Sequence, residues 1–87
     1  MKKPELLSVS EQLGHAIRVQ RTRLRLTQEE LAVKAGVARN YVSDLERGVR
    51  SPGLHMIARL SQALECRLAE LFSDVDVPRT SKTQKKG

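Results

Sequence analysis

Aromatic residues and cysteine are scarce in this chain, which has one tyrosine, one phenylalanine, no tryptophan and one cysteine among 87 residues. Proteins that bind single-stranded nucleic acids stack the bases on several aromatic rings, so the composition excludes that kind of platform. The single Cys66 permits no internal disulfide, which agrees with the reducing conditions of the cytoplasm. We therefore expect a cytoplasmic location.

Long hydrophobic runs are also absent. No apolar stretch approaches the roughly 18 residues that a membrane-spanning helix needs. The N-terminal stretch MKKPELLSVSEQ has two lysines but no continuous apolar segment after them, so it lacks the pattern of a secretory signal. We expect no membrane partner.

The residue patterns of catalytic and metal sites are missing as well. His15, His55 and Cys66 are single and widely spaced, unlike the closely spaced ligands of a metal site. The chain has neither a glycine-rich phosphate cradle nor a nucleophile elbow. We expect no enzymatic activity, no cofactor and no metal, and we interpret Cys66 as an inert packing residue.

Basic residues are abundant, with sixteen lysines and arginines against ten acidic residues and a net charge of +6. This balance suits a polyanionic partner, although membranes and acidic proteins also attract basic surfaces. A chain of this length fits one small domain, which buries only about 60 to 65% of the surface that it exposes when unfolded. Oligomerisation would add to such modest stability.

The stretch 27–48, TQEELAVKAGVARNYVSDLERG, predicts two short helices joined by a tight turn. Thr27 and Glu30 have the spacing of a capping box, which starts a helix. Gly36 is placed to end this helix, because glycine adopts positive φ without strain. The inward side of the helix is formed by small and apolar residues: Leu31, Ala32 and Ala35.

A second helix is predicted over residues 38–47, with Gly48 ending it. Val42 and Leu45 lie on one side of this helix. The opposite side carries polar groups, on Arg39, Asn40, Ser43 and Asp44. Such a helix is suited to the major groove of DNA, with its N-terminal residues at the base edges. The same pattern also fits an ordinary helical hairpin with a solvated polar face.

At these residues the sequence resembles the Cro and phage-repressor type helix-turn-helix family, also called the XRE family. The resemblance covers roughly residues 13–72 and rests on Arg21, on TQxELA from Thr27, on Ala35-Gly36-Val37, on VSxLERG from Val42, and on Pro52. The run RNYVSDLERGVR from Arg39 to Arg50 is most like the controller proteins of restriction-modification systems.

The resemblance implies a sequence-specific transcription regulator that binds double-stranded DNA. Members of this kind act as homodimers on near-palindromic operators. An alternative within the same fold is an antitoxin that binds a partner toxin and also represses its own promoter.

Helices are predicted on both sides of the motif. Ser10 is the expected cap of a first helix that runs to about Arg23. Its inward stripe comprises Leu13, Ile17 and Leu24. A fourth helix is predicted over residues 54–64 and a short fifth over residues 67–72. The inward face of the fourth comprises Leu54, Ile57, Leu60, Ser61 and Leu64.

The resulting fold class is all-α, a five-helix bundle of the lambda-repressor-like type. We expect a loose N-terminal arm over residues 1–9 and a helix-turn-helix domain over residues 10–73. Residues 74–87 contain a proline, hydroxyl residues and several lysines, so we expect them to form a disordered basic tail.

The residues predicted to read bases are those on the polar side of the second motif helix. The Arg39 guanidinium can bond both major-groove acceptors of guanine, and Asn40 can do the equivalent with adenine. Ser43 and Asp44 follow one turn later on the same face. A carboxylate near phosphates is repelled unless it accepts from a cytosine amino group or orients a neighbouring arginine, either Arg39 or Arg47.

The residues predicted to contact phosphates surround that face. By resemblance to the family, Gln28 anchors the DNA backbone at the positive end of a helix dipole. Arg47 and Arg50 leave the second motif helix on the side where a DNA backbone would pass. Tyr41 either offers its hydroxyl to a phosphate or packs as part of the core.

Two further features are implied by the resemblance. Arg21 is expected to pair with Glu46 inside the domain, as an arginine and a glutamate at these places do in the family. Dimer contacts are expected in the fifth helix, at Leu68, Leu71 and Phe72, although these three side chains could equally complete the core of the monomer.

Overall fold

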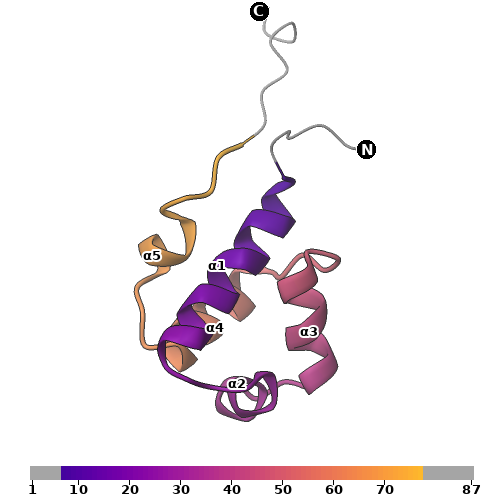
Figure 1. Ribbon diagram of the computed structural model, residues 1–87, viewed down its shortest axis with the longest axis vertical. Helices are drawn as coiled ribbons and strands as arrows, with labels where there is room; N and C mark the ends of the chain where they lie inside the picture. The colour runs from indigo at the N-terminus through magenta and orange to yellow at the C-terminus, as the bar shows by residue number, and fades with distance from the viewer. Residues whose placement is uncertain (1–6, 78–87) are drawn as a thin grey trace, which may run out of the picture.

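The computed structural model describes residues 7–77, and within that range the chain is entirely helical apart from its connections. The elements are α1 (Val9–Arg23), α2 (Gln28–Ala35), α3 (Arg39–Arg47), α4 (Leu54–Ala63) and α5 (Leu68–Phe72). Helix α1 runs along the middle of the molecule, with α3 on one side and α5 on the other (Figure 1). The predicted all-α bundle of five helices is confirmed for this part of the chain.

The cap of helix α1 is Ser8, two residues before the predicted Ser10. The Ser8 hydroxyl accepts from the Glu11 amide at 3.0 Å, and the Glu11 carboxylate accepts from the Ser8 amide at 2.9 Å. Ser10 is therefore not the cap. The reciprocal pair needs an acid three residues after the hydroxyl, and only Ser8 has one, because Leu13 follows Ser10 at that distance.

The helix-turn-helix forms where its local signals predict it. Thr27 and Glu30 make the capping box of α2, with bonds of 2.8 and 3.0 Å. Gly36 ends α2 at a φ of +73°, and Gly48 ends α3 at +77°. Both glycines are in the left-handed region, where any other L-residue is strained.

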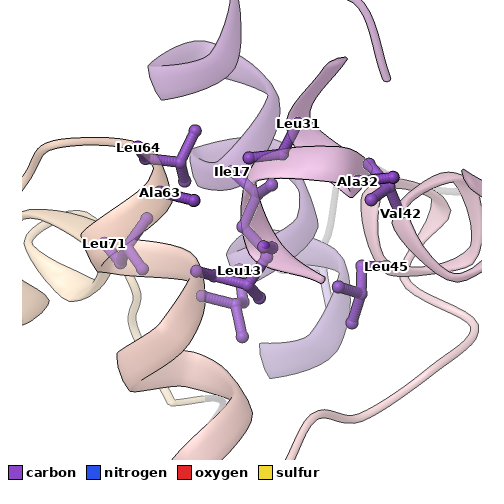
Figure 2. Close-up of a cluster of buried hydrophobic side chains, with 11 residues drawn as sticks. Leu13, Ile17, Leu31, Ala32, Val42, Leu45, Ala63, Leu64 and Leu71 are labelled. Carbon is purple, nitrogen blue, oxygen red and sulfur yellow. The ribbon is translucent and has the colours of Figure 1, made fainter. Parts of the chain in front are cut away.

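The core is one cluster to which every helix contributes (Figure 2). The predicted inward residues of α2 and α3 are all buried in it, as is Ile17 of α1. The cluster comprises Leu13, Ile17, Leu31, Ala32, Ala35, Val42, Leu45, Leu60, Ala63, Leu64 and Leu71. Cys66 is half-buried against the cluster, in agreement with its interpretation as a packing residue.

Helix α4 departs from its predicted inward face at one end. Leu54 is 73% exposed, so its assignment to the core is wrong. The buried residues of α4, Leu60, Ser61 and Ala63, all lie in its second half, and Leu54 occupies the first helical position, before the helix reaches the core. The buried Ser61 hydroxyl donates to the carbonyl of Ala58 at 2.9 Å, which offsets the penalty of burying a polar group.

Helix α5 completes the core with one leucine. Leu71 is fully buried, whereas Leu68 and Phe72 are 41% and 38% exposed. For Leu71 the monomer-core alternative therefore holds. Of the three, Leu68 and Phe72 remain accessible to a partner, and dimer contacts there stay a prediction.

The chain after α5 turns back along α1. The Gln12 side chain donates to the carbonyl of Asp76 and accepts from its amide, both at 2.7 Å. Residue 76, which the sequence analysis assigned to the tail, is thus hydrogen-bonded to the first helix. The remainder of that tail, residues 78–87, and residues 1–6 of the predicted arm lie outside the described residues.

Helices α1 and α3 approach each other closely at Gly14, a residue that the sequence pattern does not mark. A Cβ atom at this position would meet the carbonyl oxygens of Leu45 and Glu46, the latter at 2.8 Å. Both obstacles are backbone atoms of α3, so they cannot swing aside as the end of a flexible side chain would. The absence of a side chain at Gly14 therefore allows α1 to pack closely against the backbone of α3.

Gly14→Ala should lower the free energy of unfolding by about 1 to 3 kcal/mol through overpacking. Helix propensity alone predicts the opposite sign, a gain of about 1 kcal/mol for alanine. Urea denaturation followed by circular dichroism measures the difference. Gly53→Ala is the matched control, because a Cβ atom at Gly53 meets nothing within 4 Å. A Gly14→Ala variant as stable as wild type would contradict the steric argument.

Candidate nucleic-acid interface

Helix α3 lies at one edge of the molecule (Figure 1), with its apolar side against the core and its polar side outward. Arg39 and Asn40, in the first turn, are exposed. Ser43 and Asp44, one turn later, are half-buried. The four residues predicted to read bases therefore share one accessible helix, and the longest of these side chains, Arg39, stands at its N-terminal end.

The predicted ion pair between Arg21 and Glu46 is present. Arg21 Nε and Nη2 donate to the two carboxylate oxygens of Glu46 at 2.6 and 3.0 Å, and Arg21 Nη1 donates to the carbonyl of Leu26 at 2.7 Å. The side chains are only 14% and 5% exposed. Hydrogen bonding to Glu46 raises the pKa of the Arg21 guanidinium further above its usual value. The pair ties the end of α3 to the end of α1.

Gln28 joins this pair, which the sequence analysis did not predict. Its side-chain amide donates to Glu46 Oε1 at 3.0 Å. Because the amide nitrogen carries two hydrogens, this bond leaves one hydrogen for another acceptor. Glu46 thus receives bonds from α1 and α2, and the predicted phosphate contact of Gln28 would start from a side chain that is already oriented.

Two arginines near the end of α3 are held by side chains of that helix. Arg47 Nη2 donates to Asp44 Oδ1 at 2.7 Å, which matches one of the two arginine partners predicted for Asp44. The guanidinium carbon of Arg50 lies 5.1 Å from the centre of the Tyr41 ring. The ring is half-buried and packs against the core, so the packing alternative for Tyr41 holds, while a phosphate contact of its hydroxyl stays a prediction.

The charge of this face is positive. The two acidic residues of α3, Asp44 and Glu46, are both paired with arginines. Arg39 and Arg50 therefore add positive charge that these carboxylates do not cancel. The first turn of α3 has no acidic residue, so no carboxylate in that turn offsets the positive end of the helix dipole near Arg39.

Other kinds of site find little support in the described part of the chain. Within residues 7–77 no three histidine, cysteine, aspartate or glutamate side chains gather as metal ligands. In the same range no helix has the length and apolar character needed to cross a membrane. Burial raises the pKa of the Cys66 thiol, and the nearby negative charge of Glu70 adds to this effect, so little of the reactive thiolate forms at neutral pH.

Arg21→Ala should destabilise the domain by about 3 to 5 kcal/mol, because it leaves the buried Glu46 carboxylate without its partner. Thermal and urea melts followed by circular dichroism test this. Lys34→Ala is the control: it removes an exposed ion pair with Glu65, of 3.2 Å, and should cost less than about 1 kcal/mol. If both variants lost the same free energy of unfolding, burial would not make the loss of the Arg21 pair more costly than the loss of an exposed pair.

Comparison with known proteins gives the family. The profile of the helix-turn-helix family matches residues 17–71. The transcriptional regulator SlrR of Bacillus subtilis is 39% identical over 61 residues, which are 69% of this chain and 40% of that protein. Control protein C.MunI of a Mycoplasma species is 37% identical over 51 residues, 59% of this chain and 69% of that protein.

Solved structures agree with the sequence relatives. The restriction-modification controller protein C.AhdI from Aeromonas hydrophila is 40% identical with a TM-score of 0.70, over 71% of this chain and 94% of that chain. The clp gene regulator ClgR from Corynebacterium glutamicum is 32% identical with a TM-score of 0.75, over 82% and 91%.

The chain spans half or less of the first curated relatives that it matches, 40% and 50% of their lengths. The relatives that carry a functional name are regulators and controller proteins, and not enzymes. The resemblance predicted from the motif residues is confirmed: the chain belongs to the helix-turn-helix family, of the XRE type.

Proposed function

We propose that this protein regulates transcription by binding specific double-stranded DNA sequences through α3. One observation carries the proposal: α3 buries its apolar residues completely and presents outward the side chains that complement base edges. The ion pair at Glu46 fixes this helix on its support. The names of the relatives, which are transcriptional regulators and restriction-modification controller proteins, support the same function.

In this proposal the residues of the interface divide into two groups. Arg39, Asn40, Ser43 and Asp44 read base edges in the major groove. Gln28, Tyr41, Arg47 and Arg50 contact the phosphates and set the position of the protein. The hydrogen bond between Arg47 and Asp44 restrains one side chain from each group. Asp44 is thereby partly neutralised, which reduces its repulsion from the DNA backbone.

We further propose that the protein binds as a homodimer in the cytoplasm. Its operator would be near-palindromic, with half-sites about one helical turn, or roughly 34 Å, apart. The exposed Leu68 and Phe72 of α5 supply apolar surface that a second copy would cover. The partly exposed apolar side chains agree with the expectation that so small a domain gains stability by association.

Selection of bound sites from a random pool of duplex oligonucleotides tests the function most directly. The proposal predicts enrichment of one motif with two-fold symmetry. Failure to enrich any motif, from low to moderate salt, would contradict it. Purification from the native host distinguishes the antitoxin alternative, because an antitoxin would bring a second small protein with it.

Arg39→Ala should weaken binding to the selected operator by about 1 to 3 kcal/mol and leave binding to random duplex nearly unchanged. The reason is that a bidentate contact to guanine is lost while the phosphate contacts stay. Fluorescence anisotropy with both duplexes measures the two affinities. Arg18→Ala, which removes an exposed charge from α1, controls for net charge. Equal losses on both duplexes would make Arg39 a phosphate contact.

Arg50→Ala should weaken binding to all duplexes alike. The negative slope of log affinity against log salt should become shallower by about one. Each phosphate contact releases roughly one counterion, so the slope counts such contacts. A titration series between low and moderate salt gives the slope, again with Arg18→Ala as the control. A slope identical to that of wild type would exclude a phosphate contact at Arg50.

A further inference from the structure

Arg50 lies in the connection between α3 and α4, two residues beyond the glycine that ends α3, and its side chain is exposed. An arginine in such a place ordinarily samples many rotamers, and a ligand that orders it must offset the lost entropy. Here its guanidinium carbon lies 5.1 Å from the centre of the Tyr41 ring. The side chain is therefore in contact with α3 although the backbone has left that helix.

Tyr41 is suited to hold this cation because its ring cannot move freely. The ring is half-buried and packs against the hydrophobic core. A guanidinium over an aromatic face is attracted by the negative charge of the π-system. Tyr41 therefore provides a well-anchored aromatic ring for an exposed arginine of the interface.

The kind of contact that orders Arg50 decides whether its N–H groups stay available to bind DNA. Attraction between a guanidinium and an aromatic ring depends on the positive charge of the cation and needs no oxygen acceptor. Asp44 lines the same surface hollow as Tyr41 and Arg50, and its Oδ1 already accepts from Arg47 Nη2 at 2.7 Å. Arg47 thus uses an N–H group on a carboxylate, whereas the contact between the Arg50 guanidinium and the Tyr41 ring involves no carboxylate.

We propose that Tyr41 is a positioning residue for Arg50: its ring pre-orders the guanidinium beside the exposed face of α3, so that DNA meets a cation already in place. This inference rests on the proposed function, since it assigns Arg50 a phosphate as ligand. Tyr41 acts through Arg50 in this role, which differs from the direct contact between the tyrosine hydroxyl and a phosphate.

The contact itself is tested in the free protein by NMR. The δ-methylene protons of Arg50 should be shifted upfield by the ring current in wild type and in Tyr41→Phe, and should return to ordinary values in Tyr41→Leu. Because no DNA is present, this result does not depend on the proposed function. Arg50 protons at ordinary values in wild type would overturn the inference.

The consequence for binding is tested by comparing Tyr41→Phe with Tyr41→Leu on the selected operator. Both variants lack the hydroxyl, so any hydroxyl contact cancels, and the Arg50→Ala background cancels differences in packing that do not involve Arg50. With Arg50 present, Tyr41→Phe should bind about two- to five-fold more tightly, the range expected for an exposed cation–π contact. In the Arg50→Ala background the two variants should bind equally.

A ratio that is the same in both backgrounds would overturn the inference, because the ring would then act independently of Arg50. Circular dichroism confirms that each variant is folded at the temperature of the assay, and Tyr41→Met replaces Tyr41→Leu if the latter does not fold. A wild-type protein that binds no duplex selectively would refute the proposed function instead, while the NMR shifts would still decide whether Tyr41 holds Arg50.

Discussion

The bidentate ion pair between Arg21 and Glu46 is the interaction on which the rest of this structure depends. It joins the last turn of α1 to the last turn of α3, and Gln28 brings the start of α2 to the same carboxylate. Taking two charges out of water is unfavourable, so such a pair contributes through its geometry more than through net stability. Here the geometry fixes three helices relative to one another.

Helix α1 supports the C-terminal half of α3. Glu46 is paired there, and the carbonyl oxygens of Leu45 and Glu46 pack against Gly14 without an intervening side chain. The N-terminal end has the opposite character. Ala38 provides no side-chain cap and the first turn has no acid, so the end with Arg39 and Asn40 offers amide groups and positive charge outward. A helix that is buried along its apolar side and exposes Arg39 and Asn40 in its first turn suits a protein that inserts it into a groove.

The features that could be predicted from sequence are those that depend on nearby residues or on the family pattern. The capping box at Thr27 needs only its own turn, and the ends of two helices follow from Gly36 and Gly48. The ion pair of Arg21 was predictable only through the family resemblance, since 25 residues separate its members.

The features that were missed depend on tertiary contacts. Gly14 carries no pattern in sequence, because its importance comes from the α3 backbone opposite it. The exposure of Leu54 depends on which part of α4 reaches the core. The central claim is that the contacts around the Arg21–Glu46 pair fix α3 firmly against α1, and amide hydrogen exchange of the free protein tests it. The amides of α3 that are bonded within the helix should be protected nearly as strongly as those around Ile17 in α1. Exchange of α3 by local opening, far faster than that of α1, would contradict the account.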